Sequence, residues 1–343
     1  MRSSHKSQAL AGAAMLTILA AAAPASAQVT AAKGFHVAPF GQVPSGATKP
    51  DSIVVLDHHI WVGYGDTAAP DGSSGTSQVI AYNPDGSVAY NLTLTGHNDG
   101  LRFDPGTRKL WAVQNEDAIP NVVYIDPKTG SMSKAVNLRP VNGGGYDDEA
   151  FIGGNIFVSA SNPALDAKGQ NFHPALVDLV PVGNGYVPET VIAGNSPAVN
   201  TVTGQASKLN LTDPDSLTVT PDGNLLLDDQ GDAQLILLRL NGTPGPYISQ
   251  IPLIGGVQVD DTVFATSTHG ALYVTDTSAN TIYKITSGQW HLGKPYSAST
   301  GVPRTTTAPA IPSFVGELFL DSGATIPVVT GLQSAHGLAF QGY

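Results

Sequence analysis

Cysteine is absent from the 343 residues, so the chain can form neither a disulfide framework nor a thiolate nucleophile. Its stability must come from a packed core, and hydrophobic residues make up 41% of the chain, which is enough to build one. Basic residues are also scarce, with 16 Lys and Arg against 27 Asp and Glu and a net charge of −11. Because binding to a phosphate backbone needs a basic surface, nucleic acid is not expected as a partner, and a cation or a neutral small molecule fits better.

Long apolar runs are missing beyond the N-terminus, where no segment approaches the roughly 20 apolar residues of a membrane-spanning helix. The N-terminus itself has Arg2 and Lys6, then an apolar run from about Ala9 to Ala23, then Ala25-Ser26-Ala27. This order is typical of a secretory signal peptide with its small-residue cleavage site. We therefore expect cleavage after Ala27 and an exported protein, secreted or periplasmic and not membrane-spanning. Loss of Arg2 and Lys6 would change the net charge from −11 to −13.

Helix signals are missing as well. No window combines a 3.6-residue apolar period with helix caps, so almost no helix is expected. The chain has 38 glycines and 25 prolines, and short alternating apolar runs lie between turn sequences. One such turn is Pro221-Asp222-Gly223-Asn224, where proline sets φ and glycine and asparagine tolerate positive φ. These features predict an all-β protein.

A short pattern recurs six times, consisting of an acid or histidine, a small residue, and an aliphatic or aromatic residue. The copies are Asp51-Ser52-Ile53, Asp99-Gly100-Leu101, Glu149-Ala150-Phe151, Asp215-Ser216-Leu217, Asp261-Thr262-Val263 and His336-Gly337-Leu338. Their spacings are 48, 50, 66, 46 and 75 residues, and three of these are near the length of a four-stranded propeller blade. We predict that residues 28–343 form a single six-bladed β-propeller domain. Five or seven blades stay open, because the 75-residue interval could contain a divergent blade.

The positions of the repeats predict how the ring closes. The last copy leaves room for only one strand, so the segment around Phe35 to Gln42 is expected to complete the last blade. Such closure removes open sheet edges, and a monomer is expected. After Asp261, the segments ALYV and TIYKI are expected to be further strands of that same blade. Two insertions, at about 163–210 and 291–313, are expected to be loops on one face.

The repeated acids are candidate metal ligands. The first strand of each propeller blade lines the central channel, so the acid that opens each copy should point toward one axis. Converging carboxylates raise each other's pKa, and a Ca²⁺ ion with 6 to 8 oxygen ligands would offset that repulsion. The candidate ligands for Ca²⁺ or another divalent cation are Asp51, Asn98, Asp99, Glu149, Asp215 and Asp261. The alternative is that each acid accepts backbone hydrogen bonds from the next blade and only holds the ring together.

Two histidines are candidate catalytic residues. His97 lies in the segment Gly96-His97-Asn98-Asp99-Gly100-Leu101, and Gln114-Asn115-Glu116-Asp117 follows one strand later. These polar positions should meet near the channel, where His97 could act as a general base. His336 in the last copy is a second candidate base, although a lone histidine is more often a turn or packing residue. No GxSxG motif is present, so covalent serine catalysis is not expected.

The segments DSLTVTPDGNLLLDDQGDAQLILL and DDTVFATSTHGALYVTDTSANTIYKI resemble the blades of the six-bladed propellers related to senescence marker protein, gluconolactonase and strictosidine synthase, with NHL-repeat proteins as looser relatives. The resemblance implies a divalent cation in the channel, usually calcium, that polarises a lactone or ester while acid and amide side chains hold it. It implies Asn98, Asp99, Glu149, Asp215 and Asp261 as ligands. The Glu-Gly-Pro segment that opens the gluconolactonase motifs is absent, and the first copy here reads Pro50-Asp51-Ser52.

Two functions are consistent with the sequence. The first is an exported, metal-dependent hydrolase of a lactone or other ester, with the cation as Lewis acid and a histidine as base. The second is a non-catalytic propeller that binds a small molecule, a sugar or a protein through its loop-rich face. No motif for a nucleotide or redox cofactor favours a lyase or an oxidoreductase.

Overall fold

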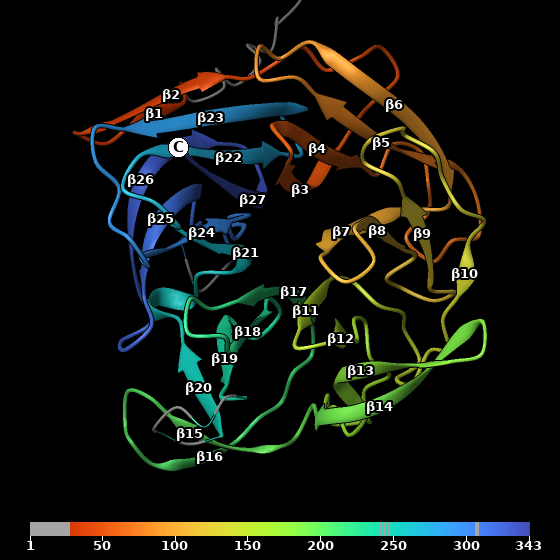
Figure 1. The fold of residues 1–343 in the computed structure, drawn as a ribbon. Coiled ribbons are helices and arrows are strands. Elements are labelled where there is room, and N and C mark those ends of the chain that lie inside the picture. The colour runs from red at the N-terminus through yellow and green to blue at the C-terminus, as the bar shows by residue number, and fades with distance from the viewer. Residues whose placement is uncertain (1–27, 241, 243–244, 246, 306–308) are drawn as a thin grey trace, which may run out of the picture.

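The computed structural model describes residues 28–240, 242, 245, 247–305 and 309–343. Within them the chain is a six-bladed β-propeller, with six sheets arranged around a central axis (Figure 1). The single helical element in these residues is a 3₁₀ turn, η1 (Ile254–Gly256), and none of them forms a helix long and apolar enough to cross a membrane. The predicted all-β, six-bladed fold is confirmed, while the predicted signal peptide lies outside the described residues.

The first three blades follow one another along the chain, and each has four antiparallel strands with the first strand innermost. Blade 1 contains β3 (Pro50–Leu56), β4 (His59–Tyr64), β5 (Thr76–Tyr82) and β6 (Val88–Thr95). Blade 2 contains β7 (Asn98–Asp104), β8 (Lys109–Gln114), β9 (Asn121–Ile125) and β10 (Val136–Asn137). Blade 3 contains β11 (Glu149–Ile152), β12 (Asn155–Ser159), β13 (Pro174–Val182) and β14 (Gly185–Ala193).

Blade 4 is enlarged at its outer edge. Its four main strands are β17 (Pro214–Val219), β18 (Leu225–Asp229), β19 (Gln234–Leu238) and β20 (Ile248–Pro252). Two more strands, β15 (Pro197–Asn200) and β16 (Ala206–Lys208), extend it, with β15 parallel to β20. The segment 163–210 was predicted to be a loop insertion, and this is wrong for most of its length. It supplies β13 to β16, because its alternating apolar residues bury Leu176 toward blade 4 and Val177 toward blade 2.

Blades 5 and 6 combine strands from distant parts of the chain. Blade 5 contains, from the axis outward, β21 (Val259–Phe264), β24 (Pro295–Ser299), β25 (Ser313–Phe319), β26 (Ala324–Leu332) and β1 (Thr30–Ala31). Blade 6 contains, in the same direction, β27 (Ala335–Gly342), β22 (Gly270–Asp276), β23 (Thr281–Ser287) and β2 (Phe35–Pro39). The early strand β2 and the C-terminal strand β27 therefore belong to the same sheet, as predicted, and close the ring.

The strands that follow β21 were expected in its own blade, and this is wrong. The hairpin of β22 and β23 crosses to blade 6, because β21 pairs with β24 and β22 pairs with β27. Trp290 fixes the crossing: it is 1% exposed between the two blades, and its Nε1 donates to the Gly270 carbonyl at 3.0 Å. The predicted loop at 291–313 contains β24 and the bridge between Val302 and Ile311. The 75-residue interval thus contributes strands to both blades, and the described part of it forms no seventh.

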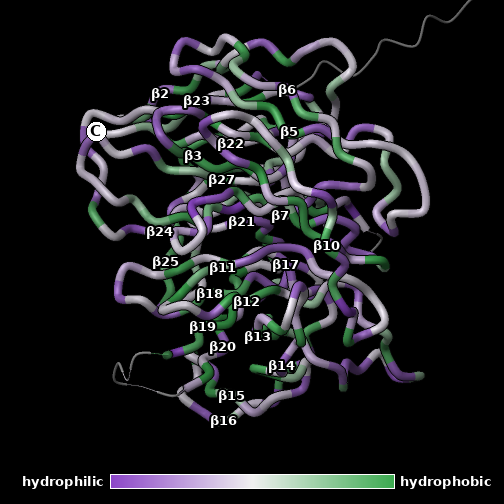
Figure 2. The backbone as a smooth tube through the Cα atoms, turned by 45° about the vertical axis from the view of Figure 1, so that its right-hand side comes forward, coloured by the Kyte–Doolittle hydropathy of each residue, from purple (hydrophilic) through white to green (hydrophobic). Residues whose placement is uncertain are grey.

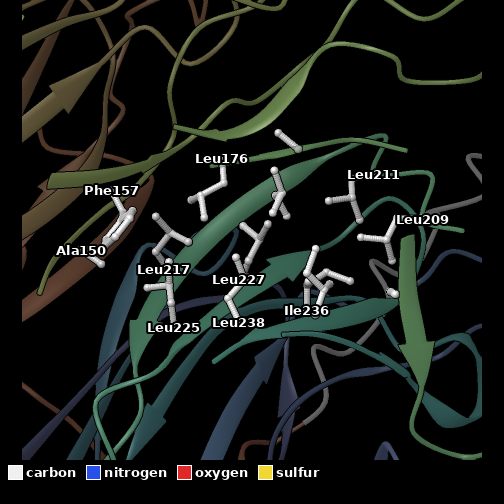
Figure 3. Close-up of a cluster of buried hydrophobic side chains, with 14 residues drawn as sticks. Ala150, Phe157, Leu176, Leu209, Leu211, Leu217, Leu225, Leu227, Ile236 and Leu238 are labelled. Carbon is white, nitrogen blue, oxygen red and sulfur yellow. The ribbon is translucent and has the colours of Figure 1, made fainter. Parts of the chain in front are cut away.

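The core lies between the blades. Buried hydrophobic side chains of the described residues form six clusters, one at each junction of neighbouring blades. On β18, Leu225 and Leu227 face blade 3 (Figure 3), whereas Leu226 faces blade 5. A strand that is buried on both faces is therefore apolar at successive positions, which is why LLL follows the Pro221 turn. Around the whole ring, hydrophobic segments (green) are interspersed with hydrophilic ones (purple) (Figure 2).

Candidate functional site

The inner strands share an irregularity where the sequence repeat falls. On β3, β7, β17 and β27, two consecutive residues lie opposite a single residue of the neighbouring strand, as where Asp51 and Ser52 lie opposite Gly63. β21 has an extra residue, Asp260, between its paired residues Val259 and Asp261. These are β-bulges, which re-aim side chains toward a site. Each bulge directs an acid or a histidine into the channel instead of along the regular alternation of the strand.

Blade 3 has the same arrangement just before β11 begins. The Asp147 amide donates to the Ser159 carbonyl at 3.2 Å, and the Ser159 amide donates to the Asp148 carbonyl at 3.0 Å. Asp147 and Asp148 thus lie opposite the single residue Ser159, and Glu149 pairs regularly with Val158. The bulge position of blade 3 is therefore Asp147.

This geometry corrects the register of two repeats. Glu149 lies two positions beyond the bulge residue of its blade, and Asp261 lies one position beyond Asp260. The residues at the first bulge position, which we call the channel ring, are Asp51, Asp99, Asp147, Asp215, Asp260 and His336. Sequence reasoning missed Asp147 and Asp260. The available signal was that each lies in an uninterrupted acidic run with its neighbour.

The channel ring surrounds one polar cavity at one end of the channel, which we call the acidic cavity. Its volume is about 230 Å³, and all six residues of the channel ring line it. Five more acids contribute to its walls, namely Glu116, Asp117, Asp148, Asp213 and Asp261. The basic groups in these walls are Arg102, His97 and His336. Ten carboxyl groups around one small space make a cation the best complement to it.

Three of the lining residues bring metal-ligating atoms together. One donor atom each of His97, Asp99 and Glu116 lies within 4.8 Å of the other two. His97 Nδ1 is 3.0 Å from Glu116 Oε2. The segment is held by Asn115, at positive φ, whose Oδ1 accepts from the His97 amide at 3.0 Å and whose Nδ2 donates to the Ile119 carbonyl. The sequence prediction that the segments around His97 and Glu116 meet at the channel is therefore confirmed.

The two histidines have raised pKa values. Burial lowers the pKa of His97, but the hydrogen bond and the charge of Glu116, together with Asp51, raise it above its ordinary value. Burial also lowers the pKa of His336, yet the carboxylate of Asp260 and, less strongly, that of Asp51 raise it to about 9. His336 Nδ1 donates to the Ser334 carbonyl at 3.0 Å, and its Nε2 lies 3.6 Å from Asp260 Oδ1. Without a cation, His336 is an imidazolium at neutral pH.

Four carboxyl groups of the channel ring are held in surroundings that disfavour their ionised form. Burial raises the pKa of Asp99, Asp147 and Asp215 well above the ordinary range, and the other carboxylates of the cavity raise them further. Burial raises the pKa of Asp260 to about 7, although His336 opposes the shift. A cation in the cavity would relieve both causes, because it replaces lost water contacts and offsets like charge.

Three of the predicted metal ligands instead make hydrogen bonds within and between blades. Glu149 Oε1 accepts from the Arg102 amide of blade 2 at 3.0 Å, and Asp261 Oδ2 accepts from the Leu338 amide of blade 6 at 2.8 Å. Asn98 Nδ2 donates to two carbonyl groups of blade 2 at 3.0 Å. Asn98 and Glu149 do not line the acidic cavity, while Asp261 does. The bonds of Glu149 and Asp261 are those of the alternative in which each acid accepts backbone hydrogen bonds from the next blade.

Arg102 forms the inner wall of the acidic cavity and was missed by sequence reasoning. Its Nη2 donates to Asp148 Oδ2 at 2.6 Å, to Asp261 Oδ1 at 3.3 Å and to the Leu217 carbonyl at 3.5 Å. The same Asp148 oxygen accepts the Leu217 amide at 2.9 Å. Arg102 thereby connects four blades across the axis. Burial lowers its pKa, but these carboxylates raise it, so the side chain stays charged.

The glycine in the last repeat has a steric reason that can be tested. A Cβ built on Gly337 would lie 2.4 Å from the carbonyl oxygen of Asp51, which belongs to the backbone of the next blade. We expect Gly337→Ala to lower the free energy of unfolding by about 2 kcal/mol, because the two inner strands must move apart. Gly185→Ala is the matched control, since a Cβ there meets nothing within 4 Å. Urea unfolding measures both, and equal values for the two variants would contradict the explanation.

Comparisons with known proteins support the fold. No known family profile and no curated protein sequence matches the chain. A protein of unknown function from Bacteroides caccae matches with 12% identity and a TM-score of 0.50, over 85% of this chain and 86% of that one. Virginiamycin B lyase from Staphylococcus aureus matches with 13% identity and a TM-score of 0.45, over 74% and 99%. A protein whose name assigns it to the gluconolactonases matches with 14% identity and a TM-score of 0.47, over 88% and 82%. The match with a TM-score of 0.50 shows similarity of fold alone, because only 12% of its residues are identical.

Proposed function

We propose that the acidic cavity binds a divalent cation, with calcium as the best fit, and that the cation-loaded protein hydrolyses a small polar lactone or ester. The observation that carries the proposal is the convergence of the channel ring, with five aspartates in one cavity of about 230 Å³. The raised pKa values of Asp99, Asp147, Asp215 and Asp260 mean that the ionised cavity is unfavourable without a positive charge inside it. The proposed protein is exported through its N-terminal signal sequence and acts as a monomer.

The donor set favours calcium. His97, Asp99 and Glu116 are the residues that would hold the ion, with Asp51 and Asp147 of the channel ring as further oxygen donors nearby. Calcium takes 6 to 8 oxygen ligands, whereas zinc prefers nitrogen and sulfur, and the cavity offers ten carboxyl groups and two imidazoles. The buried Oδ1 of Asp148 has no hydrogen-bond partner among the described residues, which also supports an additional polar guest.

The chemistry follows from the groups around the cavity. A bound cation supplies Lewis acidity toward a carbonyl oxygen. His336 has a pKa near 9, so it can donate a proton or a hydrogen bond to a leaving oxygen at neutral pH. The hydrogen-bonded pair of His97 and Glu116 is the group that would accept a proton from an attacking water. The walls are almost entirely polar, so the substrate expected here is small and hydrophilic.

One observation favours a second function, non-catalytic binding of a small cationic ligand. His336, with a pKa of about 9, is an imidazolium at neutral pH and cannot act as a general base, and the raised pKa of His97 shifts that ring in the same direction. If the cavity works in that protonation state, it recognises a ligand by charge alone. The two functions differ in whether cation loading produces turnover.

The test is calorimetric titration of the purified mature chain with Ca²⁺, followed by a screen of lactones and esters. We expect Asp99→Asn to weaken Ca²⁺ binding at least tenfold, because it removes one charge from the cluster that would hold the ion; tenfold corresponds to about 1.4 kcal/mol. Asp321→Asn is the control, since Asp321 is exposed in the turn between β25 and β26. Binding without turnover would favour the second function. Absence of cation binding in the wild type would overturn the proposal.

A further inference from the structure

A second cavity lies on the other side of Arg102, at the opposite end of the channel. We call it the apolar cavity; its volume is about 390 Å³. Arg102 and Asp261 line both cavities and therefore form the partition between them. The apolar cavity does not involve the channel ring, and none of the proposed cation-holding residues reaches it.

The apolar cavity is built from the inner strands after their bulges. All six contribute hydrophobic side chains, among them Val55, Phe103, Phe151, Val219, Val263 and Phe340. These side chains are only partly covered, and Val219 is 40% exposed. Apolar surface left in contact with water costs about 25 cal/mol per Å², so an apolar guest that covers it gains that energy. The volume falls within the range of about 300 to 1,000 Å³ of typical small-molecule sites.

Polar side chains also line this mostly apolar space, namely Arg102, Asp261, Glu149, Thr218 and Thr262, and Arg102 is the charged donor among them. The Arg102 side chain donates to the described residues from Nη2 alone, so Nε and Nη1 have no acceptor among them. Neither nitrogen belongs to the buried polar atoms that lack a partner, which means that both are open to the space around them. Asp148 and Asp261 already balance the charge of Arg102. An anionic guest would meet these carboxylates, so an uncharged oxygen is the acceptor that fits.

We infer that the apolar cavity is a second ligand site, which takes an uncharged, mostly apolar molecule with one hydrogen-bond-accepting oxygen at its end. The apolar body covers the side chains of the inner strands, and the oxygen accepts a hydrogen bond from Arg102. This site is distinct from the acidic cavity in both its walls and its ligand class. The inference does not rest on the proposed function, because it needs neither a cation nor turnover.

The experiment compares two probes of nearly the same shape, 2-acetylnaphthalene and 2-ethylnaphthalene, by equilibrium dialysis against the full mature chain. We expect the ketone to bind at least tenfold more tightly than the hydrocarbon, because only the ketone can accept from Arg102. EDTA and Ca²⁺ should leave its affinity unchanged within twofold. Val219→Asp should weaken ketone binding at least tenfold by placing a charge at the cavity wall. Val88→Asp is the matched control, because Val88 is 42% exposed on the outer strand β6.

Several outcomes would overturn the inference. Absence of ketone binding removes the site, and equal affinity for the two probes removes the role of Arg102. An equal loss of binding in Val219→Asp and Val88→Asp would assign the effect to general destabilisation. Light scattering gives the last test: a dimer that dissociates in Val219→Asp but not in Val88→Asp would mean that a second copy of the chain covers the cavity, in place of a small molecule.

Discussion

The cation-free protein should become less stable as the pH rises, which is the reverse of the behaviour of most acidic proteins between pH 4 and 7. The reason is that Asp260 has a pKa of about 7 in the folded chain and an ordinary value of 3.8. The folded state therefore binds more protons than the unfolded state in this range, and its stability falls as pH rises. His336 acts in the same direction at higher pH, since its pKa is raised from 6.5 to about 9.

The magnitude is large for buried groups. One pKa unit corresponds to about 1.4 kcal/mol, so Asp260 alone accounts for a loss on the order of 4 kcal/mol between pH 4 and 7. For a chain of this size the loss corresponds to a decrease in melting temperature of about 10 °C. The pKa of Asp126 is lowered beside Lys109 and opposes the trend, but that carboxylate is solvent-exposed and screened.

Thermal unfolding at pH 5 and pH 8.5, each with EDTA and with Ca²⁺, measures the effect. The melting temperature in EDTA should be about 10 °C lower at pH 8.5, and Ca²⁺ should restore it there while changing little at pH 5, where protons compete with the ion. Asp260→Asn should flatten the dependence between pH 4 and 7, and Asp321→Asn should not. A melting temperature in EDTA that rises from pH 5 to pH 8.5 would show that the channel carboxylates are not held in an unfavourable ionised state.

The arrangement of strands in blades could be predicted because it depends on local sequence patterns. Turns such as Pro221 to Asn224 and alternating strands recur along the chain, three of the five intervals between repeats are near one blade length, and each repeat marks one inner strand. The closure by Phe35 to Pro39 also followed from a local fact, the shortage of residues after the last repeat. Short-range patterns of this kind depend on backbone conformation and burial within one blade.

The register of the channel ring could not be predicted because the third position of the repeat is hydrophobic in some blades and polar in others. In four blades it is Ile53 or a leucine packed between blades, but in blade 3 it is Glu149 and in blade 5 it is Thr262. In these two blades the sequence pattern was therefore aligned to a later hydrophobic residue along the chain. A glutamate at this position is explained only by Arg102, 47 residues away in the sequence, because Glu149 accepts a hydrogen bond from the backbone amide of Arg102.

The crossing of β22 and β23 to blade 6 had no local signal. The sequences of β22 and β23 are typical of a hairpin in any blade. The strand that the hairpin pairs with depends on which inner strand it can reach. β27 at the end of the chain pairs with β22, and Trp290 fills the space between the two blades. Pairing between strands far apart in the sequence depends on packing that the sequence pattern of one segment does not contain.

Two acids that are adjacent to the same channel should respond in opposite ways to the loss of their charge. Asp147 belongs to the channel ring, where burial and the charges of Asp215 and Asp99 raise its pKa. Asp147→Asn removes a like charge, and we expect the cation-free protein to gain about 1 kcal/mol at pH 8. The same substitution removes a ligand from the cavity, so Ca²⁺ affinity should fall at least tenfold.

Asp261 has the opposite role. Its carboxylate accepts from the Leu338 and Thr262 amides and faces Arg102. In Asp261→Asn, one accepting carboxylate oxygen becomes an amide NH₂ that faces fixed hydrogen-bond donors. The substitution also leaves Arg102 with one counter-charge fewer. We expect a loss of about 3 kcal/mol, as for broken buried pairs.

Denaturant unfolding and calcium titration of both variants at pH 8 give two numbers for each acid. The expected result is a crossed pattern, in which Asp147→Asn is stabilised and binds calcium poorly while Asp261→Asn is destabilised. Equal losses of stability in the two variants would mean that Asp147 also holds blades together and that the channel ring is structural. A destabilised Asp147→Asn with normal calcium affinity would remove Asp147 from the cation site, where the bulge register places it in preference to its neighbours Asp148 and Glu149.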